Sequence, residues 1–126
     1  MEVWIATLLI CLLLPLLMIV EGVFFKRGGP KQINYIHGYR THRSMLSEET
    51  WRFAHRYCGK IWFVSGLLLL PLSAIVVLCL LDQSRVVLGV AAAIICGVQV
   101  AVLIFASLIP TELALRRTFD RNGNRK

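Results

Sequence analysis

The fold is decided by the stretch VVLGVAAAIICGVQVAVLIFASLI, residues 86–109, which contains no charged side chain. As a helix this stretch rises about 36 Å, which is enough to cross about 30 Å of hydrocarbon. Residues 3–20, whose apolar run continues past Glu21 to residue 25, and residues 61–81 have the same character. We therefore predict an all-α integral membrane protein with three transmembrane helices, at about residues 3–25, 61–81 and 86–109.

The composition agrees with this prediction. Of the 126 residues, 57% are hydrophobic and 17% are charged, whereas soluble domains average about 45–50% and about 25%. A soluble chain this short keeps much of its surface wet, so it cannot bury three such runs. The composition argues against a cytosolic enzyme domain, a disordered tail and a disulfide-linked secreted module. It favours a single membrane domain over residues 1–126.

The net charge of +7 is concentrated in two segments. Residues 26–60 carry eight Lys or Arg against two Glu, and residues 110–126 carry five against two acids. Because positive charge collects on cytoplasmic loops, we expect both segments to be cytoplasmic and the N-terminus to be outside. This bias accounts for the basic charge, so no nucleic-acid partner is expected. The start Met1-Glu2 lacks a positive region, so we interpret the first run as a membrane helix and not as a cleaved signal peptide.

The third span contains small residues at every fourth position, which places them on one helix face and lets another helix approach closely. They are Gly89, Ala93, Gly97 and Ala101. This stripe favours either packing inside the bundle or a homo-oligomer interface. Gln99 lies next to the edge of the stripe and could hydrogen-bond across such a contact.

Glu21 is a carboxylate inside an apolar run, and an acid in a membrane helix is a functional candidate. One hypothesis makes it the coupling acid of a small oligomeric transporter or channel. The other makes it an interfacial partner of a loop arginine, because it lies about one turn before Lys26. Glu112, at the inner end of the third span, is expected at a similar depth.

The loop between the first two spans opens with a sharp break at residues 28–30, Gly-Gly-Pro. Ser47 is the expected N-cap of a helix that runs without a strong breaker into the second span. One face of that helix can pack on the bundle or on the membrane, and it carries Trp51, Ala54, His55 and Cys58. A second stripe suits anionic lipid headgroups, and it carries Arg52, Arg56 and Lys60.

Neither a metal site nor a catalytic site is expected. The pair His55-x-x-Cys58 places two possible ligands on one helix face, but a zinc site needs four donors at suitable spacing. The sequence has no Gly-x-Ser-x-Gly motif and no phosphate-binding glycine loop. We therefore predict a non-enzymatic protein without cofactor or metal, with its four cysteines reduced.

Two patches of sequence keep a fixed order around the second and third spans. The first reads Ile33-Asn34-x-x-x-Gly38-Tyr39-Arg40-Thr41-x-x-Ser44-Met45, then Trp51-x-x-Ala54 and Gly59-Lys60. The second reads Pro110-x-Glu112-x-x-Leu115, then Phe119-Asp120-x-x-Gly123. Together they resemble the signature of the SdpI-type bacterial membrane proteins, over roughly residues 33–123.

The resemblance implies a bacterial plasma-membrane protein that gives immunity against a secreted antibacterial peptide. It also implies a signalling role, in which a transcriptional repressor is held at the membrane when the peptide is present. The family's founding member is longer and has additional helices, so the likeness covers the three-helix unit. By this likeness the motif residues are Asn34, Gly38, Tyr39, Arg40, Thr41, Ser44, Trp51, Gly59, Lys60 and Glu112.

Physical chemistry suggests what two of these residues do. Gly38 can adopt backbone angles closed to other residues, which lets the loop fold tightly beneath the membrane. Arg40 can form a two-pronged bond to a carboxylate or a phosphate. We hypothesise that Arg40 pairs with Glu112 or Glu21 and fixes the loop against the bundle. Alternatively, Arg40 binds an anionic lipid or a partner directly.

Overall fold

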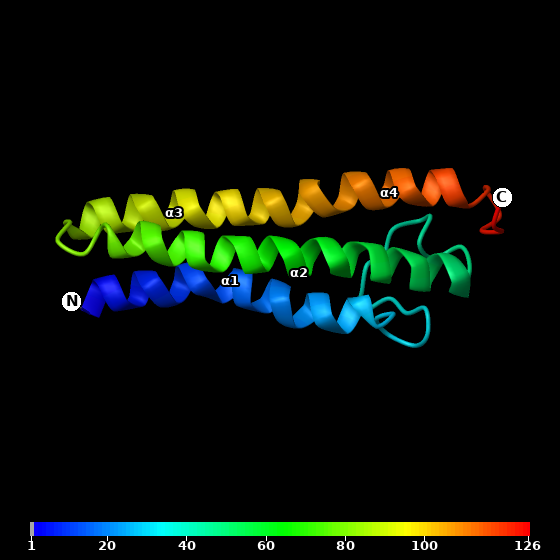
Figure 1. Cartoon of the computed structure of the whole chain (residues 1–126), viewed down its shortest axis with the longest axis horizontal. Helices are drawn as coiled ribbons and strands as arrows, with labels where there is room; N and C mark the ends of the chain where they lie inside the picture. Colours follow the sequence, from blue (N-terminus) through cyan, green and yellow to red (C-terminus); the bar gives the residue numbers. More distant parts are fainter. Residues whose placement is uncertain (1) are drawn as a thin grey trace.

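The computed structural model describes residues 2–126 as three long helical rods lying side by side (Figure 1). The elements are α1 (Glu2–Lys26), α2 (Glu48–Leu78), α3 (Arg85–Ala101), the π-helical turn η1 (Val102–Ala106) and α4 (Ser107–Thr118). The last three follow one another without a break and form the third rod. Within residues 2–126, three helical stretches are long and apolar enough to cross a membrane, which confirms the predicted fold class.

The start of α2 follows the predicted capping chemistry. The Ser47 side chain accepts a hydrogen bond from the backbone N–H of Thr50, and the Thr50 side chain accepts one from the backbone N–H of Ser47. Such a reciprocal box satisfies two N–H groups that the first turn leaves unpaired. The helix then continues through Pro71 to Leu78. The loop helix and the second span are therefore one rod, as predicted.

The contact between α1 and α2 is made by glycines. A methyl group at Gly22 would lie 2.7 Å from the backbone nitrogen of Phe63, and one at Gly66 would lie 2.8 Å from the carbonyl oxygen of Pro15. Gly59 likewise lies against the backbone at Lys26. Small residues let two helix backbones approach in a membrane, where packing contributes more than burial of apolar surface.

Midway along the bundle, Gln99 ties the three rods together. Its Nε2 donates to the carbonyl oxygen of Cys11 in α1 at 2.7 Å and to Oγ of Ser73 in α2 at 2.8 Å. Pro15 lacks the N–H that would otherwise bond the Cys11 carbonyl four residues earlier in the helix. The proline in α1 therefore leaves an acceptor free, and Gln99 of α3 fills it.

The small-residue stripe of α3 points away from the bundle. All four of its residues are exposed, and a methyl group added at Gly89 or Gly97 would meet nothing within 4 Å. The interpretation that the stripe packs inside the bundle is therefore wrong. The buried residues of α3 are Leu88 and Gln99. Gln99 faces the bundle because an amide inside the bilayer must find hydrogen-bond partners. The homo-oligomer interface stays a prediction.

The third rod extends beyond the predicted end of the span at residue 109. The turn η1 precedes α4, which continues through Pro110 to Thr118. Pro110 therefore lies inside a continuous helical rod, just after the π-helical turn, and it lacks the N–H that another residue would donate to the preceding turn. The first residues of the predicted tail are helical because the rod continues through them.

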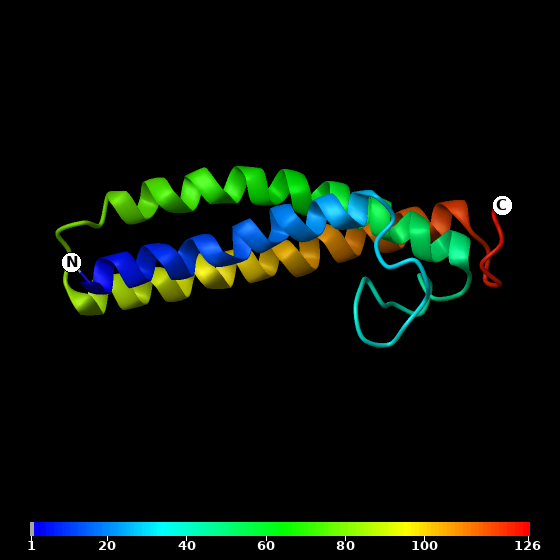
Figure 2. The same ribbon diagram turned by 90° about the horizontal axis from the view of Figure 1, so that it is seen from below.

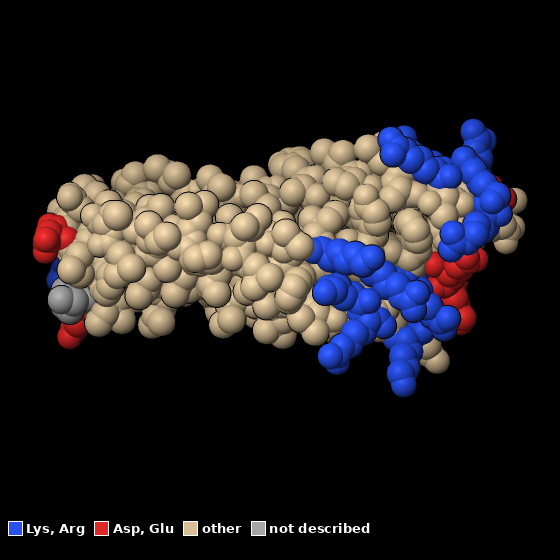
Figure 3. Space-filling view, viewed as in Figure 1, with Lys and Arg blue, Asp and Glu red and all other residues tan. Residues whose placement is uncertain are grey.

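Charge is separated along the bundle. Figure 3 shows Lys and Arg gathered over one end, with a long belt free of charged residues between the two ends. We call this the basic end, formed by residues 26–60 and 110–126. Figure 2 shows the loop after α1 leaving the bundle at this end and turning back along it. The common placement of both basic segments agrees with the predicted topology, and the orientation in the membrane stays a prediction.

Candidate functional site

At the basic end, the loop of residues 27–47 closes over one face of α2. We call this the loop cap and define it by Tyr39, Ser44, Trp51, His55 and Glu112. The predicted face of α2 supplies its floor, since Trp51, Ala54, His55 and Cys58 are each at most 1% exposed. The loop supplies its cover, and α4 supplies one wall.

His55 is the centre of the loop cap. Its Nε2 accepts a hydrogen bond from the backbone N–H of Tyr39 at 2.8 Å, so the proton of the ring is on Nδ1. Nδ1 lies 2.7 Å from the carbonyl oxygen of Trp51 and donates to it. Burial lowers the pKa of His55 below its usual value of 6.5, so the ring is neutral at pH 7.

Two glycines let the loop lie against this imidazole. Gly38 has φ of +120°, and a methyl group there would lie 2.5 Å from Nε2 of His55. Gly29 has φ of +68°, and a methyl group there would collide with the same ring. Both positions need a residue without Cβ, for conformation and for space. The Trp51 indole N–H donates to the carbonyl oxygen of Pro30 at 2.8 Å and fixes the beginning of the loop.

Tyr39 links the loop to α4. Its hydroxyl donates to Oε1 of Glu112 at 2.8 Å, across 73 residues of sequence. Its ring packs in a core with Ala54, Cys58, Leu115 and Phe119. Burial and the Glu112 carboxylate together raise the pKa of Tyr39, so the phenol stays protonated and remains a donor.

Hydroxyl side chains form a hydrogen-bonded cluster where the loop of the cap enters α2. Ser44 is fully buried, and its Oγ donates to the carbonyl oxygen of Tyr39 at 2.9 Å. The same Oγ accepts from the backbone N–H of Thr41 at 2.9 Å. The Thr50 hydroxyl reaches the carbonyl oxygen of Ser44 at 3.0 Å. These bonds hold the loop in one conformation where it enters α2.

The C-terminal residues fold back onto the start of α2. Asp120 accepts from the backbone N–H groups of Asn122 and Asn124, and Gly123 has φ of +81°. The Ser47 hydroxyl donates to the carbonyl oxygen of Gly123 at 2.9 Å. The motif's Asp-x-x-Gly turn is thus a second lock on the N-cap of α2.

The hypothesis that Arg40 pairs with Glu112 or Glu21 is wrong. Arg40 is exposed and donates to the carbonyl oxygen of Tyr35 within the loop. Glu112 receives the shorter, buried Tyr39 side chain instead, because Tyr39 points into the cap and Arg40 points out of it. Asn34 is also outside the cap, where its Oδ1 accepts from two loop N–H groups.

Glu21 lies beside His37, with Oε2 3.3 Å from the ring Nε2. The Glu21 side chain is 37% exposed and that of His37 is 52% exposed. The predicted interfacial partner is therefore a histidine and not an arginine. His37 also stacks on Phe24 at 5.7 Å between ring centroids. This contact brings the loop back to the level of the last two turns of α1.

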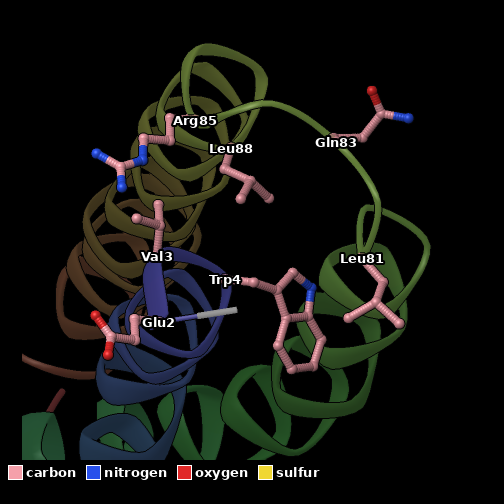
Figure 4. Close-up of a pocket in the computed structure, with 7 residues that line it drawn as sticks. All are labelled: Glu2, Val3, Trp4, Leu81, Gln83, Arg85 and Leu88. Carbon is pink, nitrogen blue, oxygen red and sulfur yellow. The ribbon is translucent and has the colours of Figure 1, made fainter.

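The opposite end of the bundle has a pocket of about 280 Å³ between the start of α1 and the turn that joins α2 to α3. Trp4 extends toward the turn, whereas the head groups of Glu2 and Arg85 point away from it (Figure 4). The Trp4 indole N–H donates to the carbonyl oxygen of Val77 at 2.8 Å. The same carbonyl accepts from the backbone N–H of Leu80 at 3.0 Å, so the Trp4 bond adds a tie between the start of α1 and the end of α2.

The structure brings together Gly38, Tyr39, Thr41, Ser44, Trp51 and Glu112 of the motif. It places Gly59 in the helix contact and leaves Asn34, Arg40 and Lys60 outside the cap. The sequence indicates His55 only as a helix-face residue and a possible metal ligand. Both ring nitrogens are engaged in hydrogen bonds. Within residues 2–126 no group of three or more metal-ligating side chains lies together.

Comparison with known proteins gives two matches. The model of the SdpI/YfhL protein family matches residues 31–110. The chain is also 43% identical over 53 residues to "Uncharacterized protein YfhL" of Bacillus subtilis (strain 168), over 42% of this chain and 48% of that protein. The match thus spans about half the length of this curated relative. No solved structure matches.

Proposed function

Because the chain belongs to the SdpI/YfhL protein family, we propose that it gives a bacterial cell immunity against, or lets it sense, a membrane-active antibacterial peptide. The protein would act in the plasma membrane by binding and without catalysis. The peptide would meet the bundle outside or within the bilayer. A transcriptional repressor would be the partner on the cytoplasmic side if the chain also signals.

The observation that supports this proposal best is the joining of the motif residues into one hydrogen-bonded unit. Tyr39 contacts α2 through His55 and α4 through Glu112. A movement of α4 relative to α2 would therefore strain the loop. Such an arrangement suits a sensor, because a ligand can shift an equilibrium only if it contacts two states differently.

Hydrogen bonds to the third rod connect the middle of the bundle with the loop at the basic end. Gln99 bonds α1 and α2 at mid-length, and the Tyr39–Glu112 bond connects the loop to the same third rod. A peptide that displaces the third rod in the bilayer would act on both points. The proposed signal is then a change in the exposure of the loop at the basic end.

The alternative of a small transporter that uses Glu21 has less support. Glu21 is partly exposed beside His37 near the end of α1. An acid that couples transport is usually enclosed in the bundle near the midplane.

The test is protection of a sensitive strain. The chain is expressed in bacteria that lack the gene, and survival is measured against a panel of membrane-active antibacterial peptides. A reporter of the neighbouring transcription unit is read in parallel. We expect at least about tenfold higher survival against one peptide, or a peptide-dependent change in the reporter.

The matched pair of variants is Tyr39→Phe and Tyr57→Phe. Each removes one phenol oxygen, but Tyr57 is 38% exposed whereas Tyr39 is 8% exposed and bonded to Glu112. Only Tyr39→Phe is expected to weaken protection or signalling at equal membrane abundance. Survival and reporter output equal to those of the empty vector, for every peptide, would refute the proposed function.

A further inference from the structure

Four cationic side chains surround one hollow at the basic end. The hollow has a volume of about 320 Å³ and lies around the Gly28-Gly29-Pro30 turn. Its charged lining comes from two segments: Arg27 and Lys31 from the loop, and Arg52 and Arg56 from α2. The ion pairs among residues 2–126 are His37–Glu21 and Arg125–Glu49, so these four cations face the hollow without a carboxylate partner.

The predicted end of the first span at residue 25 puts the hollow at the depth of lipid headgroups. Gly59 is packed against the backbone at Lys26, so these two residues are level with each other. Arg56 is about one turn below that level, at about 1.5 Å per residue. The headgroup layer of a bilayer is about 5–8 Å thick on each side. A guanidinium at this depth meets lipid phosphates.

The tip of the same loop lies nearer to the hydrocarbon. His37 contacts Glu21, which is five residues before Lys26 in α1, or about 7.5 Å toward the span. The neighbouring side chains Tyr35 and Ile36 are 84% and 88% exposed. Two large, unburied apolar residues at this level fit the boundary between headgroups and acyl chains, where aromatic residues gather.

We propose that residues 31–40 and the four-cation hollow form a docking site for one anionic phospholipid. The phosphate is bound by Arg27, Lys31, Arg52 and Arg56, and the acyl chains lie against Tyr35 and Ile36. Arginine favours this ligand because its planar fork can bond two phosphate oxygens at once. This inference is independent of the proposed immunity role.

The predicted stripe of Arg52, Arg56 and Lys60 is thereby divided. Arg52 lines this hollow, and Lys60 lines a different hollow with Glu49 and Arg125. Arg56 lies between the two hollows and lines both of them. A uniform band of positive charge would attract anionic lipid without preferring any position. The hollow instead predicts one site whose occupancy depends on particular residues.

The test measures lipid binding to the purified full chain in nonionic detergent by native mass spectrometry. Phosphatidylglycerol, phosphatidylcholine and inorganic phosphate are titrated separately, and thermal unfolding is followed in the same samples. We expect phosphatidylglycerol to bind at least about tenfold more tightly than phosphatidylcholine. Inorganic phosphate at the same concentration is expected to leave the unfolding midpoint unchanged, because it lacks the apolar part.

The charge variants locate the site. Arg52→Gln with Arg56→Gln should weaken phosphatidylglycerol binding at least about tenfold, since each cation near the surface contributes several-fold to affinity. Arg27→Gln with Lys31→Gln reaches the same hollow from the loop and should do likewise, which keeps the test valid if one pair misfolds. The control is Arg116→Gln with Arg117→Gln, which removes two charges from α4 at the same end and should change affinity less than twofold.

Three outcomes would overturn the proposal. Equal weakening by the control pair would show that only the overall charge matters. Stabilisation by inorganic phosphate equal to that by the lipid would identify a soluble anion as the ligand. Binding of an acidic polypeptide such as polyglutamate that depends on Arg52 and Arg56, without any lipid preference, would assign the hollow to a protein partner.

Discussion

The backbone N–H of Tyr39 donates to Nε2 of His55 at 2.8 Å, and this bond requires that Nε2 carries no proton. A protonated imidazole has a hydrogen on both nitrogens and cannot accept. The loop can therefore stay closed only while His55 is neutral. The same ring fills the space opposite Gly38 and Gly29, so its charge and its packing act on the same segment.

Acid should open the loop. Burial lowers the pKa of His55 in the closed state below the value of 6.5 that it has when exposed. The open state therefore binds more protons as the pH falls below about 6.5, and the stability of the closed loop is lost in that direction. The measurement is the rate of trypsin cleavage at Lys31, Arg40 and Arg43, which should rise between pH 7.5 and pH 5.5 relative to a model peptide.

Variants of the loop residues His37 and His42 and of His55 in α2 test which imidazole causes the pH dependence. His42→Gln changes an exposed side chain and should keep the pH dependence. His37→Gln removes the partner of Glu21 and should change the size of the pH dependence without abolishing it. His55→Gln should remove most of the pH dependence and open the loop at pH 7.5. A pH profile that survives His55→Gln would contradict this account.

Tyr39→Phe should lower the free energy of unfolding by about 1 kcal/mol, because a hydrogen bond to a charged group is lost and Glu112 is left without this donor. Tyr57→Phe should change it by less than about 0.5 kcal/mol, as surface substitutions do. Both values are measured by denaturant titration in detergent micelles. Because Tyr39 is protonated and His55 is neutral at these pH values, the difference should not vary between pH 7 and pH 8.

Local features of the fold could be predicted from the sequence. The spans follow from runs of apolar residues, and the N-cap at Ser47 follows from residue types within four positions. The face of α2 that carries Trp51 and His55 also follows from helical spacing. Each of these depends on neighbours in the sequence, and the structure confirms each of them.

Contacts between distant residues could not be predicted in the same way. The charge of Arg40 predicts a pairing with an acid, but whether a loop residue points inward depends on backbone angles at Gly38. From the sequence, the stripe at Gly97 and the face of Gln99 are both plausible packing faces of one helix. The amide faces the bundle because its partner is a carbonyl released by a proline 84 residues earlier.

The glycines in the contact between α1 and α2 should not tolerate substitution by alanine, whereas those of the exposed stripe on α3 should tolerate it. Gly66→Ala places a methyl group 2.8 Å from the carbonyl oxygen of Pro15, so the two helices must separate. We expect a loss of about 1–3 kcal/mol. Gly97→Ala meets nothing within 4 Å and gains helix propensity, so stability should stay equal or rise by up to about 1 kcal/mol. Unfolding in mixed micelles measures both.

Gln99 and Pro15 act on the same carbonyl, that of Cys11. Gln99→Leu removes the donor and leaves the Cys11 oxygen unpaired in the bundle, at a cost of about 0.6–2 kcal/mol. Pro15→Ala restores the backbone N–H of residue 15, which can bond that oxygen within α1. In the double variant the oxygen is satisfied without Gln99, so the loss should be smaller than in Gln99→Leu alone. A double-mutant cycle measures this coupling. Strict additivity would show that Gln99 stabilises the bundle mainly through Ser73, which its amide also contacts.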